Sequence, residues 1–320
     1  MAGRRVAVIG DFIADEFIYG EIARVSREAP VLILNYNSTE IVPGGAGNAA
    51  SNAAALGAGV RVVGQTGRDD TGRRLVATLK RRRIDVRRML APAGYRTPTK
   101  TRILAGGIHS AKQQVVRIDR ASDLVIDDRM REAFARRVLD TVGACDALIV
   151  SDYGSGLVTP ALVAEAQARM PLPLVLVDSR YQILRYKGMT ACTPNESEVE
   201  QALGVRIGDN PRILEKAGRE LLKRTKARAV LVTRGSRGMA LFQANEKTIH
   251  IPIVGSDQIA DVTGAGDTVI ATMTLALAAG GTFEEAAHLA NHAGGLVVMK
   301  RGTATVTSTE LRRAVTAQAG

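Results

Sequence analysis

Short apolar runs alternate with helical patterns along almost the whole length of this 320-residue chain. The strand-like runs are residues 5–9, 61–63, 147–150, 174–177 and 229–232. The helix-like segments are residues 46–56, 71–82, 128–142, 160–169, 211–225, 264–279 and 284–299. Continuous apolar strands separated by helices are typical of a parallel sheet that helices cover on both faces. The alternation therefore predicts an α/β fold with a doubly wound, mostly parallel sheet flanked by helices.

Two regions depart from this alternation. Residues 12–42 and 95–119 contain extended, strand-like runs with little helical period. We interpret both as insertions that form a small β-sheet lid beside the main sheet. The chain has no internal repeat and no Pro/Ser-rich linker, and α/β folds of this length often form one unit. We expect residues 1–320 to be a single domain with this lid.

The composition narrows the possible partners. Aromatic residues make up only 3% of the chain, so aliphatic residues must fill the core, and base stacking on nucleic acid is disfavoured. The formal net charge of +11 nevertheless fits a nucleic-acid surface, and residues 80–83 (Lys-Arg-Arg-Arg) are the densest basic run. The alternative is the solvated end of a helix over residues 71–82, where cations are favourable. We expect no nucleic-acid partner.

The cysteines and the N-terminus bear on location. Cys145 and Cys192 lie in apolar contexts and indicate neither a disulfide framework nor a metal site. Asp11 interrupts the apolar run near the N-terminus, which is too short for a signal peptide. No segment approaches the roughly 20 apolar residues of a membrane span. We expect a cytoplasmic protein without a membrane partner.

Residues 261–267, Asp-Val-Thr-Gly-Ala-Gly-Asp, lead directly into a run without charge, proline or glycine at 268–279. The small residues at 264–266 would let backbone N–H groups of a helix N-terminus approach an anion. Asp267 would lie beside that anion and, with an unperturbed pKa of about 3.9, is expected to be ionised at neutral pH. An anion cradle beside a carboxylate base suits phosphoryl transfer to a hydroxyl group. The alternative is a well-capped helix.

Further polar motifs follow expected strands, at the edge where α/β sheets bind ligands. They are residues 10–15, with two aspartates, residues 151–153, and the glycine-rich segment 44–48. Their carboxylate and amide groups could hold sugar hydroxyls. The alternatives are a solvated loop and a tight turn into a helix.

Residues 193–198 and 233–238 follow two other strands. Asn195 and Glu198 share one face if a helix begins there, and they suit a water-coordinated Mg²⁺, with a helix-capping pair as the alternative. Residues 233–238 form a plausible phosphate loop or a plain hairpin turn. His288 and His292 have i, i+4 spacing but no evident third ligand, so we expect no metal there.

Together these motifs resemble the PfkB (ribokinase-like) carbohydrate kinases over essentially the whole chain. One family signature is carried by Gly44, Gly45, Asn48, Gly57 and Gly67. The other is carried by residues 261–267, with Thr272 where the pattern prefers a smaller residue. The resemblance implies a ribokinase-like fold and an ATP-dependent sugar kinase.

Within the family, the chain resembles the kinase half of the bacterial heptose-7-phosphate kinase/adenylyltransferases. The likeness is carried by residues 24–31, 99–102, 113–119, 151–153, 193–195 and 261–270. It implies phosphorylation of the anomeric hydroxyl of D-glycero-β-D-manno-heptose 7-phosphate, a lipopolysaccharide-core precursor, by a stand-alone kinase without an adenylyltransferase domain. Ser155 stands where these kinases usually carry lysine, and Ser179-Arg180 where they tend to have proline and lysine. Fructose phosphate, ribose or a nucleoside therefore stay open as substrates, as does a non-catalytic sugar-binding role.

The resemblance also implies roles. Asp267 would be the general base, with Gly264, Ala265 and Gly266 around the transferring phosphoryl group. Asp15, Gly44, Gly45, Asn48 and Asp152 would hold sugar hydroxyls, and Lys100, Lys112 and Arg117 are candidates for the substrate's own phosphate. ATP would meet Asn195, Thr233, Arg234, Gly235, Gly238, Thr263, Gly264, Gly266 and Asn291, while Asn195 and Glu198 hold Mg²⁺ through water. A monovalent cation near Asp261 stays open, and a homodimer through the lid strands is expected.

Overall fold

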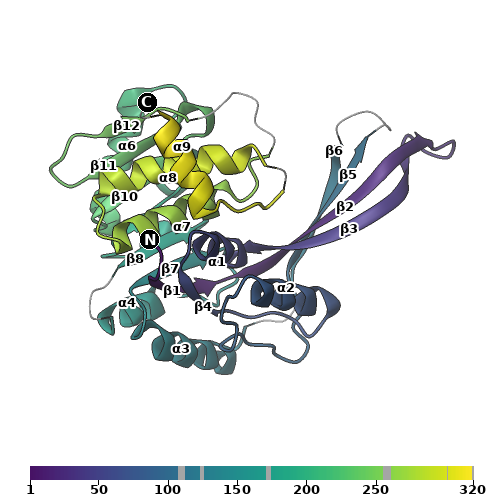
Figure 1. Ribbon diagram of the computed structural model, residues 1–320, viewed down its shortest axis with the longest axis horizontal. Helices are drawn as coiled ribbons and strands as arrows, with labels where there is room; N and C mark the ends of the chain where they lie inside the picture. Colours follow the sequence, from purple (N-terminus) through teal and green to yellow (C-terminus); the bar gives the residue numbers. More distant parts are fainter. Residues whose placement is uncertain (107–111, 123–125, 171–173, 255–260, 301, 319–320) are drawn as a thin grey trace.

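The computed structural model describes residues 1–106, 112–122, 126–170, 174–254, 261–300 and 302–318. Within them, eight strands form the main sheet in the order β12-β11-β10-β9-β8-β7-β1-β4 (Figure 1). Their bounds are β1 (Arg5–Gly10), β4 (Gly59–Val63), β7 (Ala147–Asp152), β8 (Val175–Ser179), β9 (Ala191–Cys192), β10 (Ala229–Thr233), β11 (Met239–Gln243) and β12 (Ile249–Ile251). In this order every neighbouring pair from β10 to β4 is parallel, whereas β11 runs antiparallel to both of its neighbours, β10 and β12. The expected mostly parallel sheet is confirmed.

Helices cover both faces of this sheet. One layer contains α1 (Ala46–Ala55), α2 (Asp70–Arg81), α7 (Ala265–Ala278), α8 (Phe283–Val298) and α9 (Ser308–Gln318). The other contains α3 (Asp128–Val142), α4 (Pro160–Ala168), α5 (Glu196–Leu203) and α6 (Pro211–Thr225). Successive strand residues point to opposite faces, so Val6 and Val8 pack in one core while Ala7 and Ile9 pack in the other. This is why the strands are apolar throughout.

Helix α7 is buried on nearly all sides, between α1 and α8. Its polar side chains are compatible with burial because their hydroxyl groups bond inside the helix. Thr272 Oγ1 donates to the carbonyl of Thr268 over 2.8 Å, and Thr274 Oγ1 donates to that of Ile270 over 2.7 Å. The threonine at the position where the family pattern prefers a smaller residue is thus accommodated.

Four further strands form a smaller sheet in the order β3-β2-β5-β6, which projects from the main body (Figure 1). They are β2 (Phe12–Val25), β3 (Leu32–Gly45), β5 (Thr99–Gly106) and β6 (Gln113–Arg120). The two regions that depart from the strand–helix alternation therefore pair with each other. Strand β3 continues to Gly45 and leads directly into α1, so the smaller sheet is joined to a helix of the main body.

Helix α9 is absent from the sequence-based expectation, because its short apolar stripe is weak beside its polar residues. Helix α2 ends in the basic run, with Arg82 at its C-cap, as the helix-end interpretation predicts. Among the described residues, no helix is both long and apolar enough to cross a membrane.

Candidate active site

A cavity of about 530 Å³ lies at the carboxyl ends of β7, β8 and β10, beside the N-terminus of α7. Residues expected at the site that line it are Asp152, Asn195, Glu198, Thr233, Gly235, Gly238, Gly264, Ala265, Gly266, Asp267 and Asn291. Tyr153, Asp178 and Arg180 also line it, although the sequence motifs did not select them as site residues. The structure thus brings together motifs from both halves of the chain.

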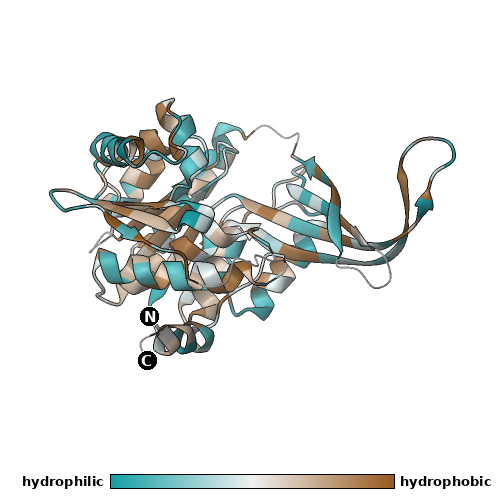
Figure 2. Ribbon diagram, turned by 90° about the horizontal axis from the view of Figure 1, so that it is seen from above, coloured by the Kyte–Doolittle hydropathy of each residue, from teal (hydrophilic) through white to brown (hydrophobic). Residues whose placement is uncertain are grey.

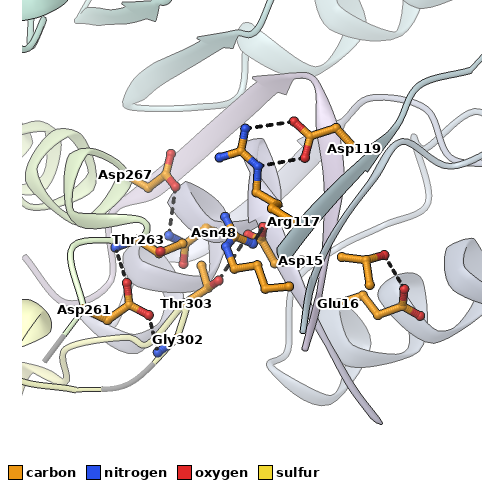
Figure 3. Close-up of polar contacts among 12 residues, drawn as sticks. Asp15, Glu16, Asn48, Arg117, Asp119, Asp261, Thr263, Asp267, Gly302 and Thr303 are labelled. Atoms are coloured by element: carbon orange, nitrogen blue, oxygen red, sulfur yellow. Dashed lines mark hydrogen bonds and ion pairs between the residues drawn. The ribbon is translucent and has the colours of Figure 1, made fainter. Parts of the chain in front are cut away.

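The turn before α7 places Asp267 in the first turn of that helix. Gly264 is the N-cap residue and has a left-handed backbone (φ 78°) that favours glycine. A Cβ atom at this position would also collide with the side-chain amide of Asn48. Asp261 holds the start of the turn, because its carboxylate accepts the backbone N–H groups of Thr263 and Gly302 (Figure 3).

Two side chains contact the carboxylate of Asp267. Asn48 Nδ2 donates to Asp267 Oδ2 over 2.8 Å, as Figure 3 shows, and to the carbonyl of Gly264 over 3.3 Å. The Tyr153 hydroxyl lies 3.5 Å from Asp267 Oδ1. Asn52 Nδ2 donates to the amide oxygen of Asn48 over 3.1 Å. Asn48 was expected to hold sugar hydroxyls, and in the structure its amide nitrogen is bonded to Asp267 and Gly264.

Burial raises the pKa of Asp267 to about 7, and the Asp15 carboxylate contributes in the same direction. The hydrogen bond from Asn48 and the charge of Lys100 oppose this rise. The expectation of an ordinary, fully ionised carboxylate at neutral pH is therefore wrong, because it ignored desolvation. A pKa near the working pH is the condition under which a general base transfers protons most effectively.

The first turn of α7 faces the cavity with its backbone. The N–H of Ala265 already donates to the carbonyl of Val262 over 3.3 Å. The next N–H groups, of Gly266 and Asp267, belong to the first helical turn, where no intrahelical acceptor exists. The anion cradle was expected at the small residues 264–266. In the structure, the backbone N–H groups available to an anion are those of Gly266 and Asp267.

Asp15 is buried next to this turn with both carboxylate oxygens engaged. Oδ1 accepts from Arg102 Nη1 over 2.5 Å. Oδ2 accepts from the Thr303 hydroxyl over 3.1 Å (Figure 3). Gly44 is packed so tightly against this carboxylate that a Cβ atom would clash with it. Gly45 forms the N-cap of α1, where its backbone has a positive φ of 55°. These residues shape the junction between the smaller sheet and the main body.

The three lid cations do not occupy equivalent places. Lys100 pairs in register with Asp15 and its ammonium lies 5.1 Å from the ring centre of Tyr153. Burial lowers the pKa of Lys100, with Asp15 opposing. Arg117 forms a two-point ion pair with Asp119 at 2.9 and 3.0 Å (Figure 3). Lys112 lies over the ring of Tyr19, which is four residues, or roughly 13 Å, further along β2 than Asp15. Only Lys100 is placed beside the Asp267 cluster.

Asp152 lines the cavity, but its carboxylate has internal partners. The hydroxyls of Ser179 and Tyr186 both donate to Oδ2 over 2.8 Å, and the Gly154 N–H donates to Oδ1 over 3.0 Å. These bonds hold the Asp152 side chain at the end of β7, where it was expected to contact a sugar hydroxyl.

Asp11 braces the turn that follows β7. Its carboxylate accepts the N–H groups of Tyr153 and Ser155 at 2.8 and 3.3 Å, and the Ser155 hydroxyl also donates to it. Burial raises the pKa of Asp11 in spite of these bonds. The serine that replaces the usual lysine therefore points toward Asp11, and Tyr153 is held in place over Lys100.

The other end of the cavity is less polar and lies between β10 and α8. Thr233, Gly235 and Gly238 line it near Met239 and Ile253. Asn291 projects from α8, and its Nδ2 donates to the carbonyl of Pro252 over 2.7 Å. An apolar slot with a few polar groups at its edge suits a planar base.

Arg234 does not line this cavity. Its guanidinium donates to Glu196 over 2.8 Å and to the carbonyl of Gly208 over 3.3 Å, so it ties the turn η2 (Gly235–Arg237) to α5. Thr263 is also outside the lining, with its N–H engaged by Asp261. The expected contacts of Arg234 and Thr263 with ATP stay predictions, and neither residue is among those that line the cavity.

Asn195 and Glu198 form a capping box at the start of α5, with reciprocal bonds of 2.9 Å. Both also line the cavity, so the capping and ligand-binding alternatives coexist. Glu198 is half-buried, and burial raises its pKa. Asp178, at the end of β8, has a pKa raised well above its usual range by desolvation and by the charges of Glu198 and Asp267. A cation bound by the carboxylates of Asp178 and Glu198 would offset the desolvation of both groups and the repulsion between them.

Oxygen donors of this kind fit Mg²⁺, which keeps several waters and binds through one or two carboxylates plus substrate phosphates. Among the described residues, no group of three or more His, Cys, Asp or Glu side chains is placed to hold a metal ion. The donor set therefore suits a Mg²⁺ that arrives with a nucleotide.

The chain matches the pfkB family carbohydrate kinases over residues 4–310. The chain belongs to this family, and it is an ATP-dependent carbohydrate kinase. This kinase is 40% identical to the bifunctional protein HldE of Desulfatibacillum aliphaticivorans over 96% of its own chain and 62% of that protein. It is 39% identical to the bifunctional protein HldE of Salmonella arizonae over 98% of its chain and 64% of the relative. The chain thus spans less than two thirds of the length of these relatives.

Solved structures show the same fold. Phosphofructokinase-2 from Escherichia coli, in complex with substrates and products, superposes with a TM-score of 0.79 at 20% identity, covering all of both chains. Ribokinase from Arabidopsis thaliana, complexed with ribose and ATP, gives 0.75 at 20% identity over 98% of this kinase and 99% of that chain. The ribokinase-like fold is therefore confirmed.

Proposed function

We propose that this kinase transfers the γ-phosphoryl group of ATP to the anomeric hydroxyl of D-glycero-β-D-manno-heptose 7-phosphate and forms the 1,7-bisphosphate. The proposal rests on the segments that resemble heptose-7-phosphate kinases and on the HldE relatives at 37–40% identity. The observation that carries the chemistry is the buried Asp267 carboxylate, oriented by Asn48 at the N-terminus of α7.

In the proposed reaction, Asp267 accepts the proton of the sugar hydroxyl as its oxygen attacks the γ-phosphorus, and ADP leaves. The N–H groups of Gly266 and Asp267 face the phosphoryl group while it is transferred and stabilise its charge. Lys100 approaches from the smaller sheet and adds a positive charge on the sugar side. Excluding water from this space strengthens each of these interactions, so we propose that the smaller sheet acts as a lid.

ATP would lie along the cavity with its base near Asn291 and its phosphates near Thr233, Gly235 and α7. Asp178 and Glu198, with Asn195, would hold Mg²⁺ through water, and the bound ion would neutralise charge on the ATP phosphates. The oxygen atoms of the site and the mutual repulsion of its carboxylates support this placement. Use of a monovalent cation near Asp261 stays an open expectation.

A specific observation keeps another sugar phosphate as the second candidate. Ser155 lacks the positive charge that heptose kinases usually carry at this position, and its hydroxyl is engaged by Asp11. Arg180 lines the cavity and keeps a cation at the other departure. The substrate phosphate would therefore depend on Lys100 and Arg180 rather than on the residue at 155.

We also propose a homodimer formed through the smaller sheet. Figure 2 shows hydrophobic stretches on the part that projects from the body. The exposed large apolar and aromatic side chains on the strands of the smaller sheet are Ile22, Val25, Leu32, Tyr36, Val115, Val116 and Ile118. Such patches and open strand edges are usually covered in solution. Sedimentation of the purified kinase should give twice the monomer mass, and a monomer at all concentrations would contradict this.

The substrate is tested by measuring ADP release from the purified kinase with heptose 7-phosphate, fructose phosphates, ribose and nucleosides. Heptose 7-phosphate should give the highest kcat/KM. A higher value for a fructose phosphate would replace the heptose assignment but keep the kinase, and ADP release with none of them would favour a non-catalytic sugar-binding role.

A further inference from the structure

A second cavity of about 530 Å³ lies between β3 and α2. Residues 39–42 of β3 form one wall, and Arg74 and Arg81 of α2, with Arg82 at its C-cap, form the other. Among the described residues, none lines both this cavity and the catalytic one. The second cavity therefore lies outside the proposed kinase reaction.

Three guanidinium groups surround this space with little to neutralise them. Arg74 Nη1 lies 3.9 Å from Asp70 Oδ2, and both side chains are largely exposed, so the pair contributes little. Arg81 Nη2 donates to the neutral hydroxyl of Thr78 over 2.8 Å. Glu40, an exposed residue of β3, supplies the lining's one carboxylate within the described part of the chain. The cavity is thus strongly positive.

Arg82 gives the decisive detail. Its Nη1 atom is buried and has no hydrogen-bond partner among the described residues. Desolvation and the neighbouring charge of Arg81 lower the pKa of Arg82, with Glu40 opposing. A buried charged group with few acceptors is costly, and because Arg82 lines the cavity, an anion bound there would reduce that cost.

We propose that this cavity binds a small oxyanion of the phosphate class, either inorganic phosphate or the phosphate group of a phosphomonoester. Guanidinium groups match phosphate oxygens with paired hydrogen bonds, and the Thr39 hydroxyl lies in the facing wall. The site accounts for part of the basic run at residues 80–83. Arg81 and Arg82 line the cavity, whereas Lys80 is exposed and is not among its lining residues.

The test is a thermal-shift titration of the full chain with inorganic phosphate, at constant ionic strength and with ADP saturating the catalytic cavity. The melting temperature of the wild type should rise and saturate. Arg82→Gln should weaken the apparent affinity about tenfold, the loss of one charge-assisted hydrogen bond. Lys80→Gln removes the same charge from the exposed part of the same helix and should titrate like the wild type.

Arg81→Gln provides a second variant in case Arg82→Gln does not fold, and it should weaken phosphate binding in the same direction. Equal titration curves for wild type, Arg81→Gln and Arg82→Gln would overturn the proposal. So would an equal rise with sodium chloride, which would indicate charge screening only. Binding of a duplex oligonucleotide that Lys80→Gln weakens as much as Arg82→Gln would assign the run to a nucleic-acid surface instead.

Discussion

Asn48 Nδ2 lies 2.8 Å from Asp267 Oδ2, although 219 residues separate the two positions in the chain. The bond joins the first turns of α1 and α7, and Gly264 leaves the room that the amide needs. Because β3 leads directly into α1, the smaller sheet is connected through Asn48 to the proposed base. Movement of that sheet would therefore shift the Asn48 amide and change its hydrogen bond to the Asp267 carboxylate.

The raised pKa of Asp267 predicts an acid limb in the pH–rate profile. The carboxyl must lose its proton before it can accept one, so activity should be low below the pKa and level off above it. The plot of kcat/KM should fall about tenfold per pH unit below pH 7, since burial raises the pKa to about 7. Rates measured from pH 5 to 9 would test this, and an acid limb near pH 4 would show that the group is not desolvated.

Replacing Asn48 should move that limb to higher pH. Its hydrogen bond lowers the pKa of Asp267 against the effect of burial. Asn48→Ala should shift the limb upward by roughly one pH unit, since a hydrogen bond to a charged group contributes about 1.5 kcal/mol and one unit corresponds to 1.36 kcal/mol. Ser51→Ala on the same helix removes only a bond to the Gly47 carbonyl and should leave the limb in place. An acid limb at the same pH in Asn48→Ala and the wild type would contradict the claim that the Asn48 amide lowers the pKa of Asp267.

Lys100 and Lys112 should differ sharply in their effect on catalysis. Lys100→Met removes the charge beside Tyr153 and should lower kcat/KM for the sugar phosphate on the order of tenfold to a hundredfold. Lys112→Met removes an equal charge far along the smaller sheet and should stay near the wild-type value. Steady-state kinetics of both variants test this difference. A larger loss of kcat/KM for Lys112→Met would contradict it and would place the substrate phosphate near Lys112.

Glu198→Gln should raise the Mg²⁺ concentration needed for half-maximal rate, by roughly tenfold for the loss of one charged contact. A glutamine at this position can preserve the capping box, so α5 should remain intact. Glu196→Gln is the matched control, because Glu196 pairs with Arg234 and Arg237 outside the cavity. A Mg²⁺ titration of activity that is the same in all three proteins would remove Glu198 from the metal site.

Local sequence patterns predicted most of the architecture. The five expected strands of the main sheet (β1, β4, β7, β8 and β10) are apolar because they are buried on both faces, and each begins and ends within a few residues of its expected bounds. The short strand β9 and the weakly amphipathic α9 carry too little pattern of their own, so only tertiary packing defines them.

The site could be predicted in position but only partly in detail. Glycine-rich turns and strand ends located the cavity correctly, since chain direction alone places them at one edge of the sheet. The direction of individual side chains depends on long-range contacts that no local pattern encodes. The contact of Arg234 with Glu196 is one such long-range contact. Asp178 is recognised as a site residue only in the structure, where it lines the cavity and the charges of Glu198 and Asp267 raise its pKa.

The central claim is that Asp267 is the base of phosphoryl transfer, and Asp267→Asn tests it most directly. The asparagine keeps the size of the side chain and should leave the fold and ADP binding unchanged. ADP formation in the presence of heptose 7-phosphate, or of whichever sugar the wild type uses best, should fall about 10² or more in kcat. A folded Asp267→Asn protein with near-wild-type turnover would contradict the account.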